Sequence, residues 1–255
     1  TLAQQLNLTA EQVGKTVQLI DEGNTIPFIA RYRKEVTGSL DDSVLRTLDE
    51  KLTALRNLAQ RKQEVQDLIG AQGKLTEEVR AAIERAATVT EVDDIYRPFR
   101  PKRKTRASVA RERGLEDLAI LLFAQEKSYT PSIEEQAARF VDPEREVPDV
   151  AAALQGAMDI VAEEVSDNAD YRRELRRLTF DAGSLTSKAA KEEDSVYAMY
   201  YDFSEPLRKL PGHRILAINR GEKEEFLKVA LTVPEDVVLG YLYNRVLSGN
   251  RSPAE

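Results

Sequence analysis

The stretch DDSVLRTLDEKLTALRNLAQRKQEVQDLIGA, residues 41–71, is the longest run of regular sequence in this chain. Its first residue, Asp41, is a favoured helix N-cap. The apolar residues that follow are spaced three, four and three apart: Leu45, Leu48, Leu52 and Leu55. This spacing predicts one long helix across the whole range. Beyond Leu55 the apolar stripe moves to another face, so we expect the two halves of the helix to pack against different neighbours.

The sequence on both sides of this stretch is also dominated by helix signals. Thr9 and Gln12 have the spacing of a capping box, and Gly23 marks the end of the helix that they begin. Other helices are expected at about 27–33, 76–87, 91–96, 108–113, 131–141, 148–167, 169–182, 204 onward, 213–220 and 235–247. The stretch FLKVALTV, residues 226–233, alternates as a strand does, and residues 184–193 are polar enough for a loop or a weak hairpin. The predicted fold class is mainly α, with at most a small β element near residues 226–233.

Composition excludes several classes of protein. The 255 residues include no cysteine, so a disulfide framework and a cysteine-ligated zinc site are both excluded. No apolar run approaches the roughly 20 residues that span a bilayer, and the N-terminal sequence has no signal-peptide pattern. We therefore expect a soluble cytoplasmic protein with no membrane partner. The missing initiator Met and the polar C-terminal tail suggest a piece of a longer chain.

The charge distribution singles out one segment, RPFRPKRKTRASVARER, residues 97–113. Eight of its seventeen residues are Arg or Lys and one is Glu, a local charge of +7 in a chain whose net charge is −7. Pro98 and Pro101 favour an extended backbone here, because the ring fixes φ and restricts the preceding residue. We call residues 97–113 the basic segment.

Two interpretations of the basic segment carry equal weight. In the first, its cations contact nucleic-acid phosphates, while Tyr96 and Phe99 stack on exposed bases. The candidate contact residues are Arg97, Arg100, Lys102, Arg103, Lys104 and Arg106. In the second, the segment is an internal strap: Arg97 and Arg100 pair with acidic helices, and the two aromatic rings enter the core.

Other basic clusters are weaker candidates. In ARYRKE, residues 30–35, Arg31 and Arg33 are further candidates for phosphate contact, although a short helix with Phe28, Ile29 and Tyr32 in the core is the favoured interpretation. In YRRELRR, residues 171–177, acidic residues lie just upstream, and a mixed-charge solvent face is favoured.

No motif for catalysis is evident. His213 is the single histidine, and a lone histidine is rarely a metal ligand or a catalytic base. Glycine-rich phosphate-binding and nucleophile-elbow motifs are absent from the sequence. We therefore expect no enzyme activity, no cofactor and no metal.

Three long segments, in order, resemble the N-terminal region of the Tex family of bacterial transcription accessory proteins. They are GNTIPFIARYRKEVTGSLD (23–41), DDIYRPFRPKRKTRASVARERGLEDLA (93–119) and DFSEPLRKLPGHRILAINRGEKEEFLKV (202–229). The resemblance implies a helical assembly with a helix-turn-helix-like element, similar in architecture to the eukaryotic elongation factor Spt6. It also implies that residues 1–200 are the Tex-like helical region and that 201–255 lead toward an RNase H-like YqgF domain outside this chain.

The same resemblance implies a function without a catalytic residue. The expected role is a scaffold that contributes to nucleic-acid binding and to transcription-related assembly. RNA or DNA would be bound mainly through regions outside this chain, above all an S1 domain, and RNA polymerase is a further expected partner. The alternative is a protein–protein interaction scaffold in which the basic segment is an internal strap without nucleic-acid contact.

Overall fold

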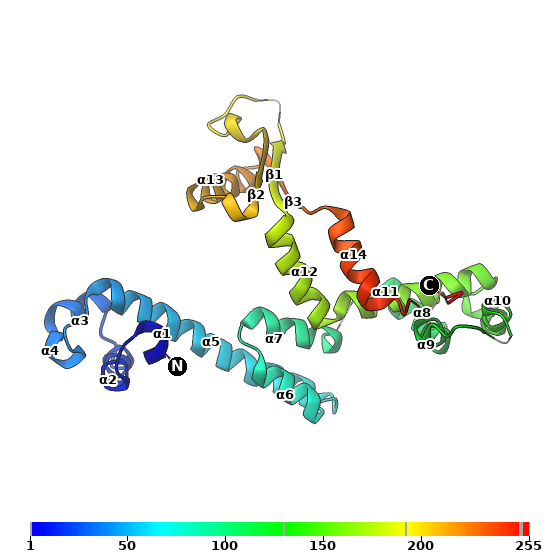
Figure 1. Cartoon of the computed structure of the whole chain (residues 1–255), viewed down its shortest axis with the longest axis horizontal. Coiled ribbons are helices and arrows are strands. Elements are labelled where there is room, and N and C mark those ends of the chain that lie inside the picture. The colour runs from blue at the N-terminus through cyan, green and yellow to red at the C-terminus, as the bar shows by residue number, and fades with distance from the viewer. Residues whose placement is uncertain (1, 102, 130, 192, 250–251, 255) are drawn as a thin grey trace. The chain divides into compact units, whose positions relative to one another are not determined.

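A computed structural model of the chain describes residues 2–101, 103–129, 131–191, 193–249 and 252–254. Its contacts divide it into two compact units, residues 1–96 and 97–255, which Figure 1 colours from blue to teal and from green to red. This division differs from the boundary expected between residues 200 and 201, because one sheet in the second unit joins strands from both sides of that point. The boundary expected between residues 200 and 201 separates regions of the family that the sequence resembles, not compact units of the fold. As a boundary between such regions it stays a prediction.

Helices build the described part of the first unit. They are α1 (Leu2–Leu6), α2 (Ala10–Asp21), α3 (Ile26–Tyr32), α4 (Lys34–Thr37), α5 (Asp42–Ala71), α6 (Glu77–Arg85) and α7 (Val89–Tyr96). The predicted capping box on α2 is confirmed, since the Thr9 hydroxyl accepts from the Gln12 amide at 3.1 Å. Asp41 is the N-cap of α5, and its carboxylate accepts from the Val44 amide at 2.9 Å. These local hydrogen bonds satisfy amides that have no partner inside the helix.

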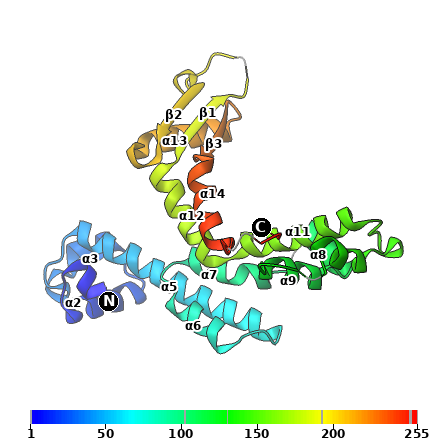
Figure 2. The same ribbon diagram turned by 45° about the vertical axis from the view of Figure 1, so that its right-hand side comes forward.

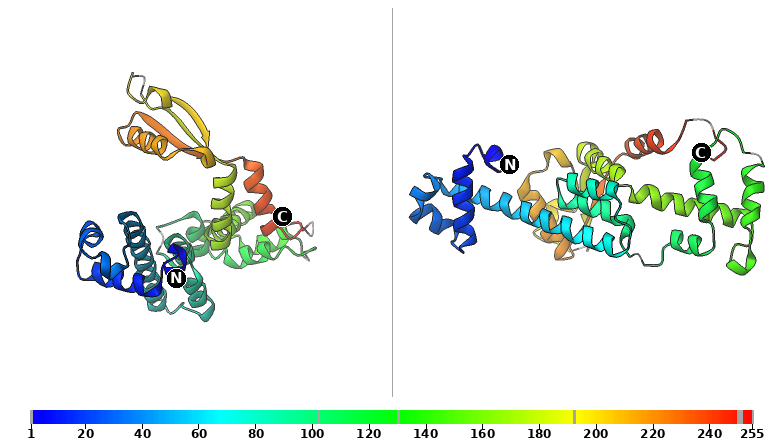
Figure 3. Two further views of the ribbon diagram at one scale, coloured as in Figure 1. Left: turned by 60° about the vertical axis from the view of Figure 1, so that its left-hand side comes forward. Right: turned by 90° about the horizontal axis from the view of Figure 1, so that it is seen from below.

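The long helix α5 carries two separate cores, as its shifting apolar stripe predicts. Leu45 and Leu48 in its first half are fully buried, and α1, α2 and α3 contact this half. Val65 and Ile69 in its second half are also fully buried, against α6 and α7 (Figure 3). Leu55, between them, is 46% exposed, so the coiled-coil spacing does not continue as a seam.

The described part of the second unit contains helices and a three-stranded sheet. Its helical elements are the 3-10 helix η1 (Arg97–Phe99), α8 (Arg106–Glu112), α9 (Glu116–Ala124), α10 (Ile133–Ala137), η2 (Ala138–Phe140), η3 (Pro143–Arg145), α11 (Val150–Asp167), α12 (Ala169–Ala182), η4 (Ala198–Tyr200), η5 (Leu207–Lys209), α13 (Gly212–Lys223) and α14 (Glu235–Val246). Its strands are β1 (Ser184–Ala189), β2 (Asp202–Pro206) and β3 (Leu227–Thr232). In Figures 1 and 2, α12 and α14 lie side by side and lead to the sheet.

Helix α11 packs closely on α8 and α9, and this contact holds the basic segment in place. Leu115, Leu118 and Ile160 are almost fully buried in the shared core. Gly156 allows the close approach, because a Cβ atom at this position would lie 2.3 Å from Leu115 Cδ1. The apolar stretch at residues 115–124 is therefore the centre of this core, although Ile120 and Phe123 remain exposed.

The sheet is larger than the sequence predicts. Its strand order is β2-β1-β3, antiparallel throughout, with Leu185 opposite Glu205 on one side and Leu231 on the other. The strand expected at residues 226–233 is confirmed as β3. The helix expected from residue 204 begins only at Leu207, as the short 3-10 helix η5, because residues 202–206 form β2. The polar stretch 184–193 contains the central strand. The pairing of β1 on both edges compensates for its weak hydrophobic pattern.

Helix α13 covers this sheet and continues past residue 220, where the sequence predicts its end. Ile218 on α13, Leu227 on β3 and Tyr197 are buried together. A Cβ atom at Gly221 would lie 2.7 Å from Leu227 Cδ1, so the glycine serves packing rather than termination. The helix instead ends at Lys223, three residues beyond the end expected from the sequence.

The mainly α fold class is confirmed. Within the described residues, no helix combines the length and the apolar character that crossing a membrane requires. The helix-turn-helix-like element stays a prediction.

Candidate nucleic-acid interface

The backbone of the basic segment is not a single extended connector. Arg97–Phe99 form η1, because the fixed φ of Pro98 also suits a 3-10 turn, so the extended backbone expected there is wrong. Helix α8 begins at Arg106, two residues before the expected helical turn. The Thr105 hydroxyl caps it by accepting from the Ser108 amide at 3.0 Å. Arg106 therefore lies on a capped helix rather than on the connector.

The outer cations of the basic segment, which we define as Arg97, Arg111 and Arg113, pair with the protein's own carboxylates. Arg97 Nε lies 2.8 Å from Asp167 Oδ1, and the Asp167 side chain is 9% exposed. Arg111 Nη1 lies 2.6 Å from Glu163 Oε2, and this hydrogen bond raises the pKa of Arg111. Arg113 pairs with Glu146. For these three residues the observed ion pairs agree with the second interpretation of the basic segment, the internal strap.

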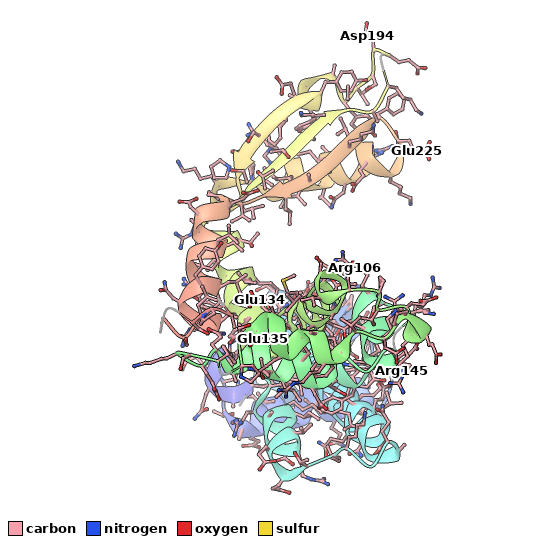
Figure 4. The ribbon with its side chains drawn as sticks, turned by 90° about the vertical axis from the view of Figure 1, so that its right-hand side faces the viewer. Arg106, Glu134, Glu135, Arg145, Asp194 and Glu225 are labelled. Atoms are coloured by element: carbon pink, nitrogen blue, oxygen red, sulfur yellow. The ribbon has the colours of Figure 1, made fainter. Side chains whose placement is uncertain are left out.

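The inner cations, which we define as Arg100, Arg103, Lys104 and Arg106, face solvent. Lys104 is 72% exposed, and its Nζ atom lies 4.0 Å from Glu112 Oε2. Arg106, which Figure 4 labels, is 85% exposed, and its Nε atom lies 3.6 Å from Asp159 Oδ1. Arg100 and Arg103 are exposed, and no ion pair within the described part of the chain includes either of them. Lys102, the remaining candidate, lies outside the described residues. The strap expected of Arg100 is therefore not found.

A groove of about 460 Å³ lies beside these inner cations, between α8 and α11. Lys104, Arg106 and Arg113 line it together with Gln155 and Asp159. Asp159 brings a negative charge to the groove wall and lies 3.6 Å from Arg106, so it weakens the attraction of an anion to this groove.

The candidates Arg31 and Arg33 lie on or next to α3, and both are exposed. The Arg33 guanidinium lies 5.4 Å from the centre of the Phe28 ring, and the Phe28 and Tyr32 rings are 5.2 Å apart. The favoured interpretation of this stretch placed both rings in the core, and for them it is wrong: Phe28 is 37% and Tyr32 57% exposed. Of the three predicted core residues, Ile29 is the one that is fully buried.

The arginine-rich helix α12 is a mixed-charge surface, as its sequence predicts. Arg173 lies 2.9 Å from Asp170, and Arg177 lies 2.6 Å from Glu174 and 2.7 Å from Asp181. His213, by contrast, is exposed on α13. No group of three or more acidic or histidine side chains suited to a metal ion occurs among the described residues.

Sequence reasoning missed the carboxylates that hold the outer cations. Glu163 and Asp167 are among the acidic residues just upstream of α12. In the fold they bind Arg111 and Arg97, which are more than fifty residues away in the chain. The spacing of residues in the sequence does not predict an ion pair between residues so far apart in the chain. The exposed aromatic rings had a usable signal, since Phe28 and Tyr32 are four residues apart and share one helix face.

Comparison with known proteins gives two family matches. The description "Tex-like protein N-terminal domain" matches residues 1–70, and "Tex central region-like" matches residues 128–243. The basic segment lies between the two matched ranges.

Individual relatives match over most of the chain. "Protein tex" of Bordetella pertussis is 43% identical over 239 residues, which cover 92% of this chain and 30% of the relative. "Transcriptional accessory protein Tex" of Neisseria gonorrhoeae is 39% identical, with coverages of 92% and 31%. "S1 RNA-binding domain-containing protein 1" of Homo sapiens is 30% identical, with coverages of 92% and 24%. The chain thus spans less than a third of the length of each of these relatives.

Proposed function

We propose, from the premise that this chain belongs to the Tex family of transcription accessory proteins, that its basic segment contacts the phosphate backbone of RNA or DNA. The contact residues are Arg100, Arg103, Lys104 and Arg106. Each phosphate that they neutralise releases counterions, so the contact gives affinity without sequence preference. The name of the human relative, an S1 RNA-binding domain-containing protein, supports nucleic acid as the ligand class.

The observation that supports this proposal is the difference in ion pairing and in exposure between the outer and the inner cations. Arg97 and Arg111 are held by carboxylates on α11, which anchors both ends of the segment. The described cations between these anchors, Arg100, Arg103, Lys104 and Arg106, are exposed, and Arg106 keeps 85% of its side-chain surface accessible. A segment fixed at its ends and charged in its middle presents cations to a ligand at little further cost in conformational entropy.

The experiment compares two variants of the 255-residue chain with equal changes in charge. The test variant carries Arg100→Gln, Arg103→Gln, Lys104→Gln and Arg106→Gln. The control variant neutralises four exposed lysines elsewhere in the second unit: Lys127→Gln, Lys209→Gln, Lys223→Gln and Lys228→Gln. Binding to fluorescently labelled single-stranded RNA, single-stranded DNA and duplex DNA is measured by anisotropy at several salt concentrations.

For the test variant we expect the slope of log affinity against log salt to become shallower by about 3 to 4 units. The control variant keeps a slope close to that of the unmodified chain. Equal losses in the two variants would mean that net charge alone matters, and they would remove the assignment to the basic segment.

A second candidate function is a protein-interaction scaffold with the basic segment as an internal strap. The pairs Arg97–Asp167 and Arg111–Glu163 favour it, because they tie the segment to α11. RNA polymerase is the proposed partner, from the relatives' description as transcription accessory proteins. Retention of polymerase by the immobilised test variant, without nucleic acid, is the outcome that supports this function. Cytoplasmic location and the lack of enzyme activity are parts of the same proposal.

A further inference from the structure

The first unit exposes an aromatic and cationic surface on and beside α3 that the basic segment does not include. We define the α3 patch as Phe28, Arg31, Tyr32 and Arg33. Ile29, on the same helix, is fully buried in a core with Leu19 and Leu45, which fixes α3 in place. The patch is therefore a feature of a folded unit and not of a loose segment.

The two rings of the patch are arranged as a platform. Their centres are 5.2 Å apart with an angle of 46° between the ring planes. The Arg33 guanidinium lies 5.4 Å from the Phe28 centre, within the range of a cation–π contact. Tyr32 nevertheless remains 57% exposed. A pair of adjacent rings held at a surface, with one of them largely accessible, is suited to stack on another flat aromatic group.

The charge around the rings is positive, although the net charge of the chain is −7. Arg31, Arg33 and the adjacent Lys34 are exposed, and no ion pair in the described residues includes any of the three. Glu35 is the one acidic residue in the stretch from Ile26 to Glu35. The patch thus differs from α12, where carboxylates neutralise the arginines.

From these observations we propose that the α3 patch binds unpaired bases of single-stranded nucleic acid, which stack on Tyr32 and Phe28 while Arg31 contacts the backbone phosphate. Stacked aromatic side chains with nearby cations suit single strands, because bases in a duplex keep their faces covered. The site is separate from the basic segment, and it stands whether or not that segment contacts phosphates.

The test uses the 255-residue chain and a thymidine tract that contains one 2-aminopurine, a base whose fluorescence falls when it stacks. The test variant is Phe28→Leu with Tyr32→Leu, which keeps apolar side chains and removes the rings. The matched control is Phe180→Leu with Tyr243→Leu, since both of these rings are 57% exposed, as Tyr32 is. Thermal unfolding of each variant is followed by circular dichroism.

We expect the unmodified chain and the control to quench 2-aminopurine, and the test variant to lose the quenching and roughly 10-fold or more in affinity for the single strand. Affinity for duplex DNA of the same length changes less than about twofold. Unchanged quenching in the test variant, or equal loss on both substrates, would overturn the proposal. Unchanged binding would leave a protein partner as the occupant of the patch.

Two further measurements separate this proposal from the phosphate contact of the basic segment. The variant with four neutralised cations in the basic segment should keep the 2-aminopurine quenching at saturating protein, although its affinity is lower. If the leucine variant does not fold, the unmodified chain is photocrosslinked to an oligonucleotide that contains 4-thiothymidine. Crosslinks on the peptide with Phe28 or Tyr32 support the proposal, and crosslinks confined to other peptides contradict it.

Discussion

Helix α12 and the basic segment are both rich in arginine, but their arginines differ in where their carboxylate partners lie. On α12 the carboxylates stand three or four residues from the arginines, so Arg173 and Arg177 are paired within their own helix. In the basic segment the nearest suitable carboxylates for Arg97 and Arg111 belong to α11. Cations without a partner at helical spacing must find one elsewhere in the fold or face solvent. Tertiary packing therefore decides which cations of such a segment remain exposed.

The largest effect is expected where the fold supports the basic segment. Gly156→Val should lower the free energy of unfolding by about 2 to 3 kcal/mol, because the new side chain overlaps the buried Leu115. The matched control is Gly240→Val in α14, where no atom lies within 4 Å of the added Cβ. Urea unfolding of both variants measures the difference. Equal stability would show that α11 does not depend on this close approach.

A smaller effect is expected from the carboxylate that anchors the basic segment. Glu163 accepts hydrogen bonds from the Thr105 hydroxyl at 3.0 Å and from Arg111, and its side chain is 16% exposed. Glu163→Gln should therefore cost about 1 to 2 kcal/mol of unfolding free energy. Glu174→Gln on α12 removes a partly exposed partner that lies three residues from Arg177, and it should not change the melting temperature measurably. Similar losses in the two variants would contradict the contrast between tertiary and local pairing.

The difference between α12 and the basic segment can also be tested by removing carboxylates from α12. Glu174→Gln with Asp181→Asn frees Arg177 from both carboxylates. If local pairing is what keeps α12 from binding nucleic acid, the salt slope of binding should steepen by about one unit. Anisotropy titration against single-stranded RNA measures this slope. A variant with Glu134→Gln and Glu144→Gln has the same change in net charge and serves as the control.

The smallest effect concerns acid pH. The hydrogen bond from Arg113 lowers the pKa of Glu146 below its usual 4.5. A depressed pKa in the folded state means that the carboxylate stabilises the fold above its unfolded pKa, and that this contribution is lost as pH falls through the folded value. Below about pH 4.5 the melting temperature of Glu146→Gln should thus fall less steeply than that of the unmodified chain. Parallel curves would show that the pair makes no net contribution.

Local chemistry was enough to predict most helices of this protein. The N-caps Thr9 and Asp41 and the apolar spacing of residues 41–71 depend on groups within a few residues of one another, so they can be recognised in sequence. The central strand β1 cannot be recognised in this way. Its sequence SLTSKA has little alternation, and it is ordered by two partners, of which β3 lies about forty residues away.

For the candidate sites, the residue types could be read from the chain but their surroundings could not. The amino-acid order alone established a cluster of cations at residues 97–113 and a Phe–Tyr pair at helical spacing beside Arg31 and Arg33. Folding decided that Asp167 and Glu163 neutralise the outer cations, that Arg106 faces solvent and that Tyr32 is exposed. The physical reason is distance along the chain. Helix caps and helix faces depend on neighbours within one or two turns, whereas the pairing and exposure of a charged or aromatic side chain depend on which remote element packs against it.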